Sequence, residues 1–234
     1  GLGDQKTVRL EHASGASAEI YLWGATLCSY KTPDQVERIF VSPKALFNGA
    51  KAIRGGIPLV FPQFGQPDTS MPQHGVARII TWALKEGSLV DTAEASCATL
   101  VLKSSDETKK MWNHDFAMEL KVTLTELSLK VALATTNTGA AEFDFSFLLH
   151  TYLKIPDIAK ATVVGLKGQK YVDKTDKTTD SAKEEKRSEI EFPQFTDSVY
   201  EGSCAIAKDV VVKSNGMPVF ALVHEAVVAG EPKA

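Results

Sequence analysis

Short segments of alternating apolar and polar residues recur along the chain, and this pattern constrains the fold more than any other feature. Residues 96–103 (SCATLVLK) and 116–124 (FAMELKVTL) alternate as a β-strand with one buried face requires. Residues 127–135 (LSLKVALAT) follow after a short polar break, so the last two segments predict a β-hairpin. No helical periodicity extends over a useful length. The sequence therefore predicts an all-β protein, a sandwich or a barrel.

Further β segments are expected before and after this region, at residues 19–30 (broken by Gly24), 143–149, 161–164, 210–212 and 219–223. The 234 residues are 44% hydrophobic, which is enough for a sizeable core, and no linker interrupts them. We therefore expect a single domain over residues 1–234.

The composition also limits the classes of partner. The formal net charge is −3, with no concentrated basic face of the kind that binds nucleic acid. No apolar run reaches the length of a membrane span or of a signal peptide. The three cysteines (Cys28, Cys97 and Cys204) are widely spaced and odd in number, which indicates reduced thiols. We expect a cytoplasmic protein that binds neither nucleic acid nor membranes.

Residues 50–78 form a long segment rich in Gly, Pro and Gln, which predicts an ordered loop lining a cavity. Arg54 stands directly before two glycines, and Gln73, His74 and Arg78 lie within six residues of one another. Two arginines in one structured loop suit a phosphate, which a guanidinium binds through paired hydrogen bonds. The alternative is that each arginine pairs with a surface carboxylate.

His150 ends the apolar segment 143–149, so we expect it to be partly exposed. An imidazole there could donate a proton near neutral pH, or it could be a structural residue at the rim of the core. The histidine spacings give no zinc pair, and no phosphate-binding glycine loop or nucleophile elbow is present. With these motifs excluded, the candidate chemistry is acid–base catalysis by histidine and carboxylate side chains. The charged stretch 173–191, by contrast, predicts mostly an exposed loop.

Four ordered motifs resemble the signature segments of the glucose-6-phosphate 1-epimerases. They are residues 54–65 (RGGIPLVFPQFG), 72–78 (PQHGVAR), 149–152 (LHTY) and 165–173 (GLKGQKYVD), and the resemblance extends over about residues 8 to 200. It implies a galactose-mutarotase-like antiparallel β-sandwich, a supersandwich, that works without a metal or an organic cofactor. It also implies that His150 is catalytic, that Arg54 and Arg78 bind phosphate, and that Gln73, His74 and Asp173 contact the sugar.

The implied reaction interconverts the α and β anomers of a hexose 6-phosphate, and its base would be a glutamate near the C-terminus. Glu225 is the best candidate and Glu231 the second. Residues 205–234 diverge from the family or are truncated, since residues 210–216 replace the expected Asn-Pro-Trp segment. Two alternatives stay open: a non-catalytic sugar-phosphate-binding homologue, and an aldose 1-epimerase for free sugars, although a neutral sugar does not need two guanidinium groups. We expect a monomer.

Overall fold

The computed structural model describes residues 5–178, 181–201 and 210–225. The chain divides into two compact units, residues 1–154 and residues 155–234, and each is described by itself. The expectation of a single domain stays a prediction. No helix among the described residues is long and apolar enough to cross a membrane.

The first unit contains two main sheets and one small ribbon. One sheet has the order β1-β2-β3, the second has the order β5-β7-β8-β9 with β6 also paired to β7, and β4 pairs with β10. Their bounds are β1 (Thr7–Glu11), β2 (Ser17–Tyr21), β3 (Thr26–Lys31), β4 (Leu59–Val60), β5 (Ala83–Leu84), β6 (Val90–Asp91), β7 (Ser96–Lys103), β8 (Phe116–Leu124), β9 (Leu129–Asn137) and β10 (Leu148–Leu149).

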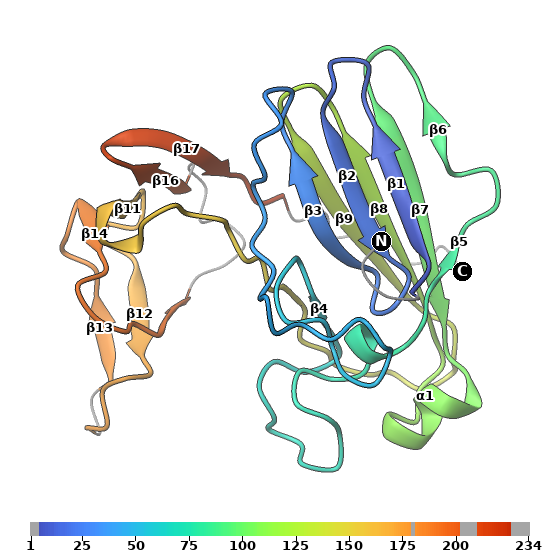
Figure 1. Cartoon of the computed structure of the whole chain (residues 1–234). Coiled ribbons are helices and arrows are strands. Elements are labelled where there is room, and N and C mark those ends of the chain that lie inside the picture. The colour runs from blue at the N-terminus through green and yellow to red at the C-terminus, as the bar shows by residue number, and fades with distance from the viewer. Residues whose placement is uncertain (1–4, 179–180, 202–209, 226–234) are drawn as a thin grey trace. The chain divides into compact units, whose positions relative to one another are not determined.

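The two sheets of the first unit enclose one hydrophobic core (Figure 1). Every second residue of β7 and β8 is buried, including Leu100 and Leu120, and these side chains meet Leu10, Ile20 and Leu27 from the other sheet. The hairpin predicted from the alternation is confirmed, because β8 and β9 pair in one unbroken antiparallel register. The prediction of an all-β sandwich is therefore confirmed.

Helical structure is brief in the described part of the chain. The one α-helix, α1 (Asp106–Met111), begins at Ser105, whose side chain and that of Thr108 form a reciprocal capping box. Two short 3-10 turns, η1 (Ala77–Ile79) and η2 (Ile158–Lys160), complete the helical content. This agrees with the lack of helical periodicity in the sequence.

The second unit contains two antiparallel sheets, with the orders β14-β11-β16-β17 and β13-β12-β15. Their strands are β11 (Ala161–Val164), β12 (Lys170–Asp173), β13 (Ala182–Glu184), β14 (Glu189–Glu191), β15 (Ser198–Glu201), β16 (Val210–Ser214) and β17 (Met217–Leu222). Val163 stands at the centre of the larger sheet, opposite Ile190 on one side and Val212 on the other.

Of two expectations about local structure, the first is confirmed for most of its length and the second is wrong. The stretch 173–191 is mostly exposed loop, but it also supplies β13 and β14 and buries Ile190 and Glu185. Its charges pair with one another, which the charge pattern alone did not reveal. The segment 143–149 is a strand only at β10, because it pairs with the two residues of β4, and Phe145 and Phe147 before it are exposed.

Candidate functional site

The loop that begins at Arg54 is held by a closed cycle of three backbone hydrogen bonds. The N–H of Gly56 donates to the carbonyl of Phe40 (2.8 Å), the N–H of Phe40 to that of Tyr152 (2.9 Å), and the N–H of Tyr152 to that of Gly56 (2.9 Å). Gly56 has a φ of +78°, and a Cβ there would lie 2.4 Å from the carbonyl oxygen of Leu27. Only glycine fits this close approach, which explains the Gly-Gly pair after Arg54.

The second loop turns at His74 and Gly75. His74 has a φ of +66°, a conformation that is uncommon for a residue with a side chain. The N–H of His74 donates to the carbonyl of Gly65 (2.7 Å), and the N–H of Gly65 donates to Nδ1 of His74 (3.0 Å). This reciprocal pair holds the imidazole in place against the cost of the strained backbone.

The buried amide of Gln63 ties the intervening residues together. Its Nε2 donates to the carbonyls of Asp68 (3.0 Å) and Pro72 (3.1 Å), and its Oε1 accepts the N–H of Asp68 (3.0 Å). The long loop is thus ordered by its own polar groups, as the sequence predicts for residues 50–78.

The hydrogen bond at Nδ1 determines the chemistry of His74. Because Nδ1 accepts a hydrogen bond from the N–H of Gly65, the neutral ring carries its own proton on Nε2. Burial lowers the pKa of His74, and the nearby Arg78 and His150 lower it further. His74 is therefore a neutral ring near pH 7 that can donate a hydrogen bond from Nε2.

His150 lies beside His74, with ring centroids 6.0 Å apart and an interplanar angle of 66°. Its backbone N–H donates to the carbonyl of Pro58 (2.9 Å), which fixes it next to the paired residues of β4 and β10. On its other side the ring stacks on Tyr152, at 4.8 Å and 22°. Within the described ranges the ring of His150 makes no hydrogen bond, so both nitrogens can exchange protons with a ligand.

Arg78 completes the cluster. Its Nη2 donates to the carbonyl of Gln73 (2.7 Å), while its buried Nε has no partner among the residues described. Burial lowers the pKa of Arg78, and the phenol of Tyr152 opposes that effect. A guanidinium with unused donors in a half-buried position is suited to an anion.

The alternative prediction, that each arginine pairs with a surface carboxylate, is not observed among the described residues. Neither Arg54 nor Arg78 makes an ion pair within residues 5–178, 181–201 and 210–225. The side chains of Arg54 and Gln73 are exposed, and each belongs to a loop that reaches the His150 cluster through its backbone.

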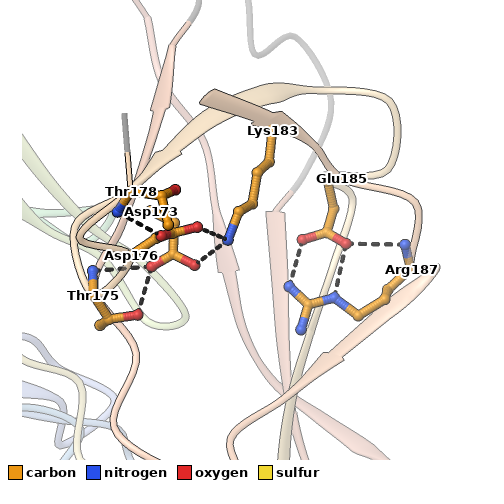
Figure 2. A network of polar contacts seen from close by, with 7 residues as sticks. All are labelled: Asp173, Thr175, Asp176, Thr178, Lys183, Glu185 and Arg187. Carbon is orange, nitrogen blue, oxygen red and sulfur yellow. Dashed lines mark hydrogen bonds and ion pairs between the residues drawn. The ribbon is translucent and has the colours of Figure 1, made fainter. Parts of the chain in front are cut away.

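Asp173 belongs to the second unit, where it ends β12 inside an ion-pair network (Figure 2). Its Oδ1 accepts the N–H (3.0 Å) and hydroxyl (2.6 Å) of Thr175, and Lys183 bridges its Oδ2 (2.8 Å) to Asp176 (3.0 Å). The hydrogen bonds from Lys183 and Thr175 hold the pKa of Asp173 well below its usual range. A carboxylate offers about four lone-pair sites, so one stays available to a sugar hydroxyl.

The other candidates near the C-terminus are placed less fully. Glu225 is exposed, three residues after β17, and Glu231 and Cys204 lie outside the described residues.

Cys28 and Cys97 are free thiols. In the part of the chain that the structure describes, no three histidine, cysteine or carboxylate side chains gather as metal ligands would.

Tyr152, Gln63 and Phe64 lie within the sequence motifs, and no role was predicted for them. Phe64 stacks on the ring of His74 at 5.6 Å, and Tyr152 stacks on His150. One signal was available for Gln63, since an amide flanked by apolar residues inside a loop must find internal hydrogen bonds. Its spacing of two residues from His150 was a signal for Tyr152, because residues i and i+2 of an extended chain lie on one face. The backbone contacts of Tyr152 with Phe40 and Gly56 gave none, because these segments are far apart in the sequence.

Comparisons with known proteins show the family of the chain. The sequence profile of the family described as Aldose 1-epimerase matches residues 6–222. A protein of Cenchrus ciliaris named "Putative glucose-6-phosphate 1-epimerase" is 37% identical over 207 residues, which are 85% of this chain and 61% of the relative. A protein of Escherichia coli with the same name is 34% identical over 197 residues, 82% of this chain and 63% of the relative.

A solved structure described as a putative mutarotase from Salmonella typhimurium has a TM-score of 0.79 and 29% identity, over 92% of this chain and 68% of that one. This chain spans between 61% and 63% of the length of the two curated relatives described above. The match to the family profile nevertheless covers most of the chain and includes every site residue placed in the first unit. The chain therefore belongs to the aldose 1-epimerase family.

Proposed function

We propose that this chain interconverts the α and β anomers of a hexose 6-phosphate, with glucose 6-phosphate as the expected substrate. The observation that carries the proposal is the gathering of His150, His74 and Arg78 in one half-buried cluster. Two imidazoles beside a guanidinium that makes no ion pair with any described residue combine proton transfer with anion binding. A site for a neutral sugar alone would not require the guanidinium.

The reaction opens and recloses a hemiacetal ring. A base takes the proton of the C1 hydroxyl, the C1–O5 bond breaks as the aldehyde forms, and protonated His150 gives its proton to O5. After rotation about C1–C2 the ring oxygen attacks the other face of the aldehyde, O5 returns its proton to His150, and the base returns its proton to the new hydroxyl. Both groups end in their starting states, so no cofactor is consumed.

The remaining site residues bind the substrate or supply the base. Arg78 and the exposed Arg54 bind the phosphate, and Nε2 of His74 donates a hydrogen bond to a sugar oxygen. Gln73 and the last free lone pair of Asp173 contact sugar hydroxyls. Glu225 is the proposed base. A cytoplasmic location, a monomeric state and the absence of a cofactor stay predictions.

The direct test compares anomer exchange of glucose 6-phosphate and of glucose by NMR saturation transfer. The proposal predicts faster exchange of glucose 6-phosphate, and a loss of that preference in Arg54→Gln and Arg78→Gln. Equal acceleration of both sugars, unchanged in the arginine variants, would identify an aldose 1-epimerase for free sugars. Saturable binding of glucose 6-phosphate without exchange above the buffer rate would identify a sugar-phosphate-binding protein.

A further inference from the structure

Tyr152 contacts the loop of Arg54 through its backbone and His150 through its ring. Its backbone belongs to the hydrogen-bond cycle with Gly56 and Phe40, so both its N–H and its carbonyl are fixed. Its ring faces the ring of His150 at a centroid distance of 4.8 Å and an interplanar angle of 22°. A side chain with a fixed backbone and two χ angles is a rigid platform for the imidazole.

The imidazole of His150 needs such a platform. None of its nitrogens is hydrogen-bonded within the described residues, so no second side chain of the kind that usually orients a catalytic histidine holds it there. Its other ring neighbours are His74, which meets it edge to face at 6.0 Å, and Tyr152 itself. The stacked face of Tyr152 is thus the feature that sets the plane of the ring.

We propose that Tyr152 is a positioning residue of the site, whose ring fixes the plane of the His150 imidazole. This inference rests on the proposed function and deepens it. The ring and the hydroxyl have different effects: loss of the ring lowers the rate with any sugar, and loss of the hydroxyl alone leaves the rate unchanged.

Three variants separate these effects. Tyr152→Phe keeps the stack and removes the hydroxyl, while Tyr152→Leu removes both. Tyr30→Phe is the matched control, because Tyr30 is a buried core residue of β3 whose loss of a hydroxyl lies outside the site. Thermal unfolding of each variant shows that it is folded before kinetics are compared.

For Tyr152→Leu we expect kcat to fall about 10-fold or more on both glucose 6-phosphate and glucose, because the imidazole loses its orientation. For Tyr152→Phe we expect kcat close to wild type on both sugars, because the stack on His150 is kept. Rescue of kcat by Phe but not by Leu distinguishes positioning from a general structural role. A folded Tyr152→Leu protein with wild-type kcat would overturn the proposal.

A further readout does not depend on turnover. The ring protons of His150 are expected to carry a ring-current shift in the NMR spectrum that survives in Tyr152→Phe and in Tyr30→Phe and vanishes in Tyr152→Leu. If wild-type protein shows no exchange, the proposed function fails, and this readout still decides for or against the role of Tyr152.

Discussion

Nδ1 of His74 accepts a hydrogen bond from the backbone N–H of Gly65 at 3.0 Å, and this contact joins the candidate site to the loop that carries it. The reverse bond, from the N–H of His74 to the carbonyl of Gly65, closes the pair at 2.7 Å. Protonation of His74 would place a donor at Nδ1 opposite the donor of Gly65. The loop and the charge state of His74 are therefore coupled.

This coupling predicts a pH-dependent contribution to stability. The folded state lowers the pKa of His74 below the usual 6.5, so the contribution is complete above about pH 6.5 and is lost as the pH falls through the lowered folded value. His74→Asn keeps a residue that tolerates positive φ but removes the imidazole. The difference in Tm between wild type and this variant should be larger at pH 7.5 than at pH 5. A difference independent of pH would contradict the coupling.

Gly75 is expected to tolerate no side chain. Its φ is +73°, and a Cβ would lie 2.1 Å from the carbonyl oxygen of Phe61. Gly75→Ala should cost about 2–5 kcal/mol of unfolding free energy, from backbone strain and the clash together. Gly87→Ala is the matched control, since Gly87 has a φ of +69° and open space around it. It should cost about 1–2 kcal/mol in the same denaturant titration. Equal losses would mean that Phe61 moves aside freely.

The buried carboxylate of Glu185 should be the main acid-sensitive group of the second unit. It accepts two hydrogen bonds from the Arg187 guanidinium (2.8 and 2.7 Å) and one from the Tyr200 hydroxyl (2.7 Å), and Figure 2 shows the pairing with Arg187. These contacts, Arg187 foremost, lower the pKa of Glu185 to about 2. The contribution of Glu185 to the free energy of unfolding is therefore complete above its usual pKa of 4.5 and is lost as the pH falls toward 2.

Glu185→Gln should lower the unfolding free energy by about 1–3 kcal/mol at pH 7, and the loss should shrink between pH 4.5 and pH 2. Glu189→Gln serves as the control, because the Glu189–Lys213 pair is more exposed and should contribute under about 1 kcal/mol. Similar losses in the two variants would show that the burial of Glu185 adds nothing.

Glu225 should be the base of the ring-opening step. Glu225→Gln removes the proton acceptor with little change in shape, so kcat for anomer exchange should fall roughly 10²- to 10⁴-fold. His224→Gln, one residue earlier, is the neighbouring control and should exchange at the wild-type rate. Wild-type kcat in Glu225→Gln would place the base on another residue.

The sequence predicts the sheets more completely than the contacts between loops. Alternation identified β7 and β8 at their observed bounds, because each strand has one buried face along its whole length. The segment 143–149 failed this test, since its apolar residues are largely exposed and only Leu148–Leu149 find a pairing partner. Apolar character alone does not create a strand where the partner is two residues long.

The candidate site, too, was predicted only in part. The motifs predicted the importance of His74, Arg78 and His150, and the structure brings these three side chains together. The stack of Tyr152 on His150 was not predicted, although residues i and i+2 of an extended chain lie on one face. The backbone cycle that joins residues 40, 56 and 152 could not be predicted, because these segments are far apart in the sequence. The pairing of Glu185 with Arg187 was missed because a run of charges resembles a solvated loop until strands bury one of its members.

The proposed transfer of a proton from His150 to the ring oxygen is tested most directly by measuring anomer exchange. Exchange between the anomers of glucose 6-phosphate is followed by NMR saturation transfer with wild type, His150→Ala and His114→Ala. His114 is the control because its ring packs on Trp112 and Phe143. We predict exchange well above the buffer rate for wild type and His114→Ala, and exchange reduced to the buffer rate for His150→Ala. Exchange by folded His150→Ala at the wild-type rate would contradict the account.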